Sequence, residues 1–139
     1  MTKILWVAAA ALVDAEDRVL LARRPEGKNM AGMWEYPGGK IEEGETPEQA
    51  VCRELEEELK IGVCPGDCLP LVFASHPYRQ FHLVMPLFLC RRWTGDPIPA
   101  EGQRIAWTPG RTVGLDPEKY PMPPADGLLS ERLRQFLTY

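Results

Sequence analysis

The chain has 139 residues, of which 45% are hydrophobic and 26% are charged, with a formal net charge of −4. This balance excludes a disordered chain and favours a single globular domain, residues 1–139, with room for a core. The acidity is local, because residues 40–60 hold eight glutamates against three basic residues. A local cluster of this kind indicates a site, and the absence of a basic patch argues against nucleic-acid binding.

The first elements in the chain have the pattern of strands. Two apolar segments, residues 4–13 and 18–23, are separated by "DAED", which predicts a β-hairpin. The first segment is too short to span a bilayer and only Lys3 precedes it, so we interpret it as a buried strand. The cysteines, described below, lead us to expect a cytoplasmic protein. A basic loop, "RRPEGKNMAGM", an aromatic segment, "WEYP", and a further loop, "GGKIEEGE", follow.

The next element is a predicted helix. Thr46 is a good N-cap, Pro47 suits the first helical position, and Gln49 completes a capping box, so the helix should run to Leu59 or Lys60. Strands are predicted at 69–75, 81–93 and 103–109, then a proline-rich loop at 114–127 and an amphipathic helix at 128–137. Strands on both sides of one helix, with another helix at the end, predict an α/β fold with a mixed sheet between helices.

The cysteines and histidines do not form a recognisable metal motif. Cys52, Cys64, Cys68 and Cys90 lack the density of a disulfide scaffold, and the Cys64–Cys68 spacing lacks a second ligand pair, so we expect reduced thiols and no zinc.

The predicted central helix concentrates carboxylates on one face. At 100° per residue, Glu54, Glu57 and Glu58 fall within an arc of roughly 100°, beside the aliphatic face that anchors the helix. Mg²⁺ or Mn²⁺ would relieve the repulsion between them, because hard cations prefer oxygen ligands. A solvated, glutamate-rich face is the alternative. The preceding Gly38 and Gly39 favour a site, since glycines permit close backbone approach and their carbonyls add oxygen ligands.

The spacing of these residues resembles the signature of the Nudix hydrolases, G-x5-E-x7-R-E-U-x-E-E-x-G-U. Glu45 stands eight residues before Arg53, so it can reach the helix and hold the loop through an ion pair. "GGKIEEGETPEQAVCRELEEELKI" matches every charged position, and Lys60 replaces the glycine that normally ends the helix, with Gly62 as the candidate to take over that stop. The resemblance implies the α/β/α Nudix fold, with Glu45 and Arg53 orienting the box. It also implies metal ligands and catalytic groups at the Gly38 carbonyl, Glu54, Glu57, Glu58 and Glu101, where Glu54 ligates or serves as the base.

Further segments resemble the MutT branch, whose members hydrolyse nucleoside triphosphates, oxidised ones included, to a monophosphate and pyrophosphate. These are "MWEYPGGKIEEGETPEQAV", "EGQ" at 101–103 and "PPAD" at 123–126. This resemblance implies a sanitising role in the nucleotide pool, related to DNA repair. It places substrate-binding residues at Arg24, Tyr36, Arg79 and Asp126. Weaker candidates are Arg23 and Lys28, which could contact the phosphates, and His76, which could contact the base. For Arg23 and Lys28 the alternative is a solvated basic loop.

Asp126 leaves the substrate open. An ionised carboxylate only accepts hydrogen bonds and suits the N1–H and N2–H₂ donors of guanine, whereas a protonated one suits the acceptor–donor edge of cytosine or adenine. 8-oxo-dGTP is therefore the first candidate and CTP, or a modified dCTP, the second; Asp126 could also simply cap the last helix. A non-catalytic Nudix-like domain would require loss of box carboxylates, and a nucleotide-sugar hydrolase is disfavoured by the short chain. We expect no membrane partner, and a monomer or a weak homodimer.

Overall fold

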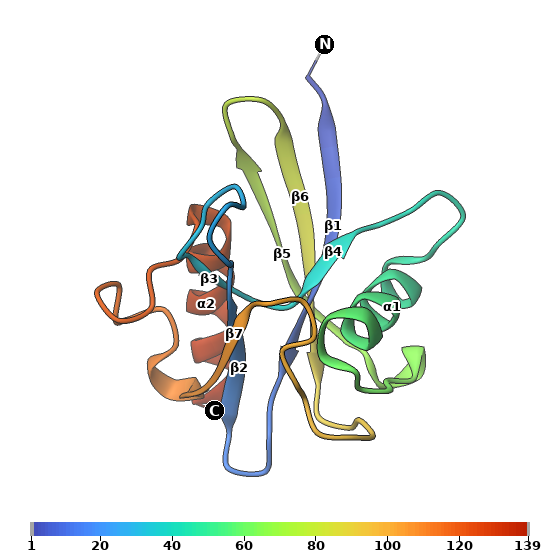
Figure 1. The fold of residues 1–139 in the computed structure, drawn as a ribbon, viewed down its shortest axis with the longest axis vertical. Coiled ribbons are helices and arrows are strands. Elements are labelled where there is room, and N and C mark those ends of the chain that lie inside the picture. Colours follow the sequence, from blue (N-terminus) through green and yellow to red (C-terminus); the bar gives the residue numbers. More distant parts are fainter. Residues whose placement is uncertain (1, 139) are drawn as a thin grey trace.

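The computed structural model describes residues 2–138, which form two β-sheets between two α-helices (Figure 1). The helices are α1 (Pro47–Leu59) and α2 (Pro124–Leu137), with short 3₁₀ helices η1 (Pro65–Asp67) and η2 (Gly110–Thr112). The strands are β1 (Ile4–Leu12), β2 (Arg18–Arg23), β3 (Trp34–Glu35), β4 (Gly38–Lys40), β5 (Leu69–Pro77), β6 (His82–Cys90) and β7 (Arg104–Pro109). Within the described residues, neither helix is long and apolar enough to cross a membrane.

The first sheet is mixed and the second is antiparallel. The first has the order β4-β1-β6-β5, in which β1 and β6 run parallel, and the second has the order β3-β2-β7. The prediction that β1 and β2 pair as a hairpin is therefore wrong. The chain does turn between them, but only one isolated bridge, between Val13 and Val19, joins the two segments, and the strands belong to different sheets. Strand β1 has β4 and β6 as its neighbours, which leaves β2 to pair with β3 and β7.

Alternate residues of β1 pack toward opposite helices, which makes this strand the centre of the core. Ala9 and Ala11 belong to the cluster that includes Leu129 and Leu133 of α2. On the other face, β1 packs into a second cluster that contains Ala8, Ala10, Leu12, Val51, Leu55 and Leu59. Because both faces of the strand are covered, the segment reads as a continuous apolar run rather than an alternating one. The predicted α/β/α arrangement is confirmed (Figure 1).

Two predicted loops are shorter than expected. The loop predicted after "WEYP" contains β4, whose Gly38 and Gly39 pair with Ala9 and Ala8 of β1. The loop predicted at 114–127 ends early, since α2 begins at Pro124 rather than at residue 128. Proline is well suited to the first helical position, where its missing N–H has no role. As a result, Asp126 lies inside the first turn of α2 and is not its N-cap.

The predicted start of α1 is confirmed and its predicted end is corrected. The Thr46 side chain accepts a hydrogen bond from the Gln49 N–H, and the Gln49 side chain accepts one from the Thr46 N–H, which completes the capping box. At the other end, Lys60 itself adopts the left-handed conformation, with φ 57° and ψ 35°, and donates its N–H to the Glu56 carbonyl. Gly62 does not take over the stop, because the left-handed residue comes two positions earlier.

Candidate active site

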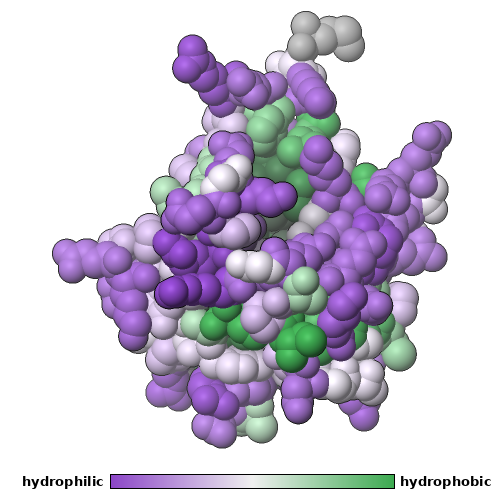
Figure 2. Space-filling view, in the orientation of Figure 1, coloured by the Kyte–Doolittle hydropathy of each residue, from purple (hydrophilic) through white to green (hydrophobic). Residues whose placement is uncertain are grey.

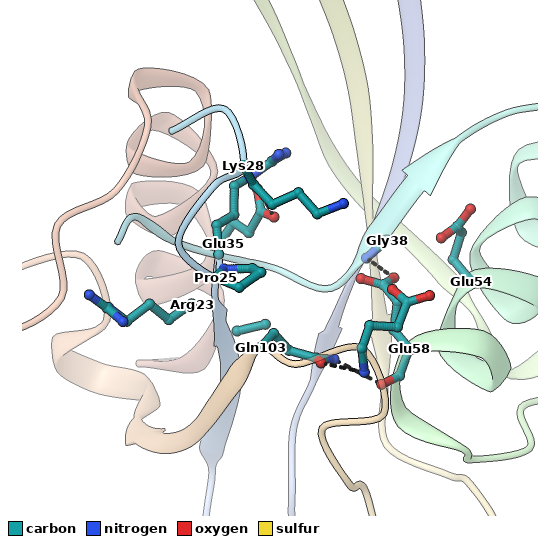
Figure 3. A pocket seen from close by; sticks show the side chains of 11 residues that line it. Arg23, Pro25, Lys28, Glu35, Gly38, Glu54, Glu58 and Gln103 are labelled. Atoms are coloured by element: carbon teal, nitrogen blue, oxygen red, sulfur yellow. Dashed lines mark hydrogen bonds and ion pairs between the residues drawn. The ribbon is translucent and has the colours of Figure 1, made fainter. Parts of the chain in front are cut away.

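A cavity of about 420 Å³ lies between α1 and the segment that joins β2 to β3. Its lining residues come from distant parts of the chain and include most of the predicted carboxylates: Ala22, Arg23, Arg24, Pro25, Lys28, Glu35, Gly38, Glu54, Glu58, Glu101 and Gln103. In Figure 2, hydrophilic side chains surround a hollow whose upper wall is hydrophobic. Figure 3 shows Lys28 on one side of the cavity, extending toward the side that carries Glu54 and Glu58.

Arg53 organises the acidic face of α1. Its guanidinium makes two hydrogen bonds to the Glu45 carboxylate, at 2.7 and 3.0 Å, and a third to the Lys40 carbonyl at 3.1 Å. The same group donates to Glu54 at 2.8 Å and to Glu57 at 3.4 Å. The two hydrogen bonds from Arg53 to Glu45 lower the pKa of Glu45. They also tie the loop before α1 to the helix. The predicted ion pair between Glu45 and Arg53 is present as expected.

The glycines of β4 make room for the carboxylates. Glu58 accepts a hydrogen bond of 3.1 Å from the Gly38 N–H. A Cβ atom on Gly39 would come within 2.6 Å of both carboxylate oxygens of Glu54, and one on Gly38 would collide with the Ala8 carbonyl. Gly38 therefore requires glycine, because a Cβ there meets backbone, while a Cβ on Gly39 would displace the Glu54 carboxylate from its place beside Arg53.

Burial and mutual repulsion strongly affect the carboxylates that face the cavity. Burial, followed by the negative charges of Glu54, Glu101 and Glu35, raises the pKa of Glu58 to about 9. The pKa of Glu54 is also raised, first by burial, although the Arg53 hydrogen bond opposes this shift. Such a conflict between like charges is relieved either by a proton or by a cation.

Gln103 anchors the loop that carries Glu101. The Gln103 side chain accepts a hydrogen bond from the Glu101 N–H and donates one to the Glu58 carbonyl, both at 2.8 Å. The N–H of Ala100 donates to the same Glu58 carbonyl at 3.0 Å. These bonds satisfy a carbonyl in the last turn of α1, which has no partner within the helix. They bring Glu101 to the cavity although it is distant from α1 in sequence.

Most of the predicted carboxylate ligands line one cavity, but among residues 2–138 they do not have the complete arrangement of a metal site. Within residues 2–138, no three His, Cys, Asp or Glu side chains lie in the arrangement of a metal site. Glu54 is held by Arg53 and Glu58 by the Gly38 N–H, whereas the Glu57 side chain is 52% exposed and does not line the cavity. Every donor is nevertheless a hard oxygen, so the composition of the set fits Mg²⁺ or Mn²⁺.

A second cavity, of about 120 Å³, adjoins the first at Arg24 and Glu35, which line both. Most of its wall is apolar, formed by Leu5, Val7, Met30, Tyr78, Phe81, Leu83, Met85 and Pro123, while Asn29 and Asp126 add polar groups. Arg24 Nε lies 3.0 Å from a Glu35 oxygen, but its N–H is not directed at an acceptor among the described residues. An apolar pocket with a few polar groups, next to a charged cavity, is suited to a nucleobase.

Asp126 is the most deeply buried of the predicted polar site residues, with 5% of its surface exposed. Its carboxyl accepts a 3.3 Å hydrogen bond from the Tyr36 N–H. Burial, followed by the Glu35 charge, raises the pKa of Asp126 to about 8, while the Tyr36 hydrogen bond and Arg24 oppose the shift. At neutral pH the group is therefore mostly protonated and offers a donor together with an acceptor.

Several predicted substrate residues lie outside both cavities or direct their side chains away from the carboxylates. The Tyr36 side chain packs in the core, where its hydroxyl contacts Ser130 Oγ at 2.7 Å, so only its main chain serves the site. His76 packs edge-on against Tyr78, with ring centroids 4.8 Å apart, and Arg79 lies in the exposed turn between β5 and β6. Arg23 lines the larger cavity, but its guanidinium is directed away from the carboxylates (Figure 3).

Sequence reasoning missed the role of Glu35 and did not single out Gln103. Glu35 sits between the two cavities and raises the pKa of both Glu58 and Asp126. A charged residue within the short aromatic segment "WEYP" was the available signal, because a carboxylate inside a half-buried strand is uncommon.

The comparisons with known proteins agree with this geometry. The 8-oxo-dGTP diphosphatase of Proteus vulgaris is 39% identical over 100 residues, 72% of this chain and 88% of that protein. The CTP pyrophosphohydrolase of Escherichia coli (strain K12) is 34% identical over 122 residues, 84% of this chain and 82% of that protein. A crystal structure of a MutT NUDIX hydrolase from Burkholderia pseudomallei is similar with a TM-score of 0.79 and 30% identity, covering 94% of this chain and 98% of that one. Because the NUDIX domain model also matches residues 4–126, the chain belongs to the NUDIX domain family.

Proposed function

We propose that this protein is a Mg²⁺-dependent hydrolase that converts nucleoside triphosphates to nucleoside monophosphates and pyrophosphate. The observation that carries the proposal is the pair of cavities joined at Arg24 and Glu35, one lined by carboxylates and the other mostly apolar. The first suits a metal-bound triphosphate and the second suits a base. The names of two relatives, an 8-oxo-dGTP diphosphatase and a CTP pyrophosphohydrolase, support the same substrate class.

The residues of the larger cavity divide into ligands and phosphate contacts. The Gly38 carbonyl, Glu57, Glu58 and Glu101 would hold the metal, with Glu54 as a further ligand in the case that it is not the base. When bound, the metal would neutralise phosphate charge and polarise the attacked phosphorus. Opposite these carboxylates, Lys28 extends positive charge toward the phosphate position (Figure 3). Arg24 lines the same cavity and would add a second positive charge.

Proton transfer needs a carboxylate near the attacking water. Glu54 is our candidate for the base, because Arg53 holds its carboxylate and burial raises its pKa toward neutrality. Glu45 acts through Arg53 and is a positioning residue.

Oxidised guanine is the first candidate for the base, with cytosine second. A protonated Asp126 presents a donor and an acceptor together. This pair complements the O6 acceptor and N7–H donor that stand side by side in 8-oxoguanine, whereas unoxidised guanine has two acceptors there. The N4–H₂ donor and N3 acceptor of cytosine are complementary too, so CTP remains the alternative. Removal of 8-oxo-dGTP in the cytoplasm would keep an oxidised base out of DNA.

A substrate panel with Asp126→Asn tests this assignment. We would measure kcat/KM for dGTP, 8-oxo-dGTP, CTP and dCTP, and identify the products, for the wild type, for Asp126→Asn and for Asp96→Asn as an exposed control. Above pH 8 the wild-type carboxyl becomes ionised while asparagine does not. The ratio between guanine and cytosine nucleotides should then differ by roughly tenfold, about 1.4 kcal/mol, between Asp126→Asn and the wild type.

Two outcomes would reject the role of Asp126. Either all nucleotides slow by one common factor, or none changes; in both cases the residue serves only the packing of α2. Release of inorganic phosphate in place of pyrophosphate would reject the proposed reaction itself.

A further inference from the structure

Three thiols meet beneath α1, on the side of the helix away from the carboxylate-lined cavity. Cys52 lies on α1, Cys68 ends η1, and Cys90 ends β6. All three belong to, or pack against, the apolar cluster between α1 and the first sheet. The Sγ atoms of Cys52 and Cys68 are 3.7 Å apart, in direct contact.

We propose that Cys52 and Cys68 form a thiol oxidation site, at which a hydroperoxide produces a disulfide that ties α1 to the start of β5. A disulfide has an S–S length of about 2.05 Å, so the two sulfur atoms must approach by less than the width of one atom. Because Cys52 is partly exposed while Cys68 and Cys90 are buried, an oxidant can reach the pair without opening the core.

The reaction balances with the peroxide as oxidant. The Cys52 thiolate attacks a peroxide oxygen and becomes a sulfenic acid, and the other oxygen leaves as an alcohol or water after protonation. The Cys68 sulfur then attacks Cys52 Sγ and forms the disulfide, and hydroxide leaves as a second water. The pair loses two electrons and the peroxide gains them.

In the second step the proton of the Cys68 thiol goes to the leaving hydroxide and completes the water. In the reduced structure the Cys68 thiol donates to the Cys64 carbonyl at 3.8 Å, and the Cys90 thiol donates to the Arg92 carbonyl at 3.3 Å. Cys68 is therefore the sulfur in contact with Cys52.

The consequence is a covalent link across the segment between α1 and β5. This segment contains η1 and is otherwise held by backbone bonds such as Gly62 with Thr94 and Cys68 with Pro65. A bond between residues 52 and 68 restricts the unfolded chain and stabilises the folded one. Glu54 and Glu58 line the cavity on the other side of the helix, so the disulfide leaves their positions unchanged.

The test is oxidation of the full chain with hydrogen peroxide at pH 8, followed by peptide mapping without reductant. We expect a Cys52–Cys68 cross-link, loss of one pair of titratable thiols, and a melting temperature raised by several degrees that returns to its original value with dithiothreitol. Cys64→Ala is the matched control, because Cys64 is exposed in the same segment but lies outside the pair. It should behave like the wild type, whereas Cys52→Ala should lose both the cross-link and the thermal shift.

Three results would overturn the proposal: cross-links through Cys64, dimers joined by a disulfide, or accumulation of sulfinic acid without a cross-link. A mapped Cys52–Cys68 bond without a rise in melting temperature would refute the stabilising role. Mapping of the wild type does not depend on the folding of any variant, and hydrolysis of nucleotides is not part of the readout.

Discussion

Replacement of Glu58 by glutamine should stabilise the metal-free protein while it removes activity. Glutamine keeps the shape of the side chain and can still accept the hydrogen bond from the Gly38 N–H. It carries no charge, so the repulsion from Glu54, Glu101 and Glu35 no longer raises the free energy of the folded state. Function and stability therefore oppose each other at this position.

The size of the effect follows from the pKa of Glu58. The pKa of Glu58 in the folded state, about 9, is above the ordinary glutamate value of 4.5, so the folded state binds the proton more tightly than the unfolded state. The resulting stability is fully present below pH 4.5 and is lost as the pH rises toward 9. At pH 7 the loss is about 3 kcal/mol. Because neighbouring carboxylates share the proton, we expect Glu58→Gln to gain about 1–3 kcal/mol at pH 7.

Urea unfolding in excess chelator at pH 5 and pH 8 measures this gain. The difference between Glu58→Gln and the wild type should be small at pH 5 and large at pH 8. Glu56→Gln is the matched control, because Glu56 lies on the exposed face of the same helix. With Mg²⁺ and substrate, the control should keep its activity while Glu58→Gln loses about a hundredfold or more in kcat. Equal pH dependence of stability in the two variants would refute the reasoning.

Three further predictions concern the metal, the C-terminal end of α1 and the Gln103 side chain. Excess chelator should abolish hydrolysis, and millimolar Mg²⁺ or Mn²⁺ should restore it in a titration; full turnover in chelator would refute the metal assignment. Lys60→Gly should raise the free energy of unfolding in urea by about 0.5–1 kcal/mol, because it relieves the left-handed conformation, whereas Lys60→Ala should not. Gln103→Leu removes two hydrogen bonds of similar geometry without a large change in volume. It should raise the Mg²⁺ concentration for half-maximal rate by roughly tenfold, and an unchanged Mg²⁺ titration would show that Gln103 does not position Glu101.

The central helix and the residues that support its acidic face are predictable from local sequence alone. Thr46, Pro47 and Gln49 specify the start of α1, because capping depends on residues within one turn of each other. The ion pair of Glu45 with Arg53 was also predictable, since helical periodicity and a short loop limit where the two side chains can lie. Both predictions rest on local geometry, which neighbouring residues define without the rest of the fold.

Tertiary packing brings together the residues of the site that are distant in sequence. Asp126 accepts a hydrogen bond from Tyr36, which is 90 positions away, and no local pattern encodes that contact. The same holds for Glu35 between the two cavities, and for the separation of β1 and β2 into different sheets. These arrangements depend on which apolar faces are buried against each other. The favoured burial has the lowest free energy for the whole core, so no single segment specifies it. The pKa values of Glu58 and Asp126 follow from it, because burial of a charge is a property of the packed molecule and not of the residue.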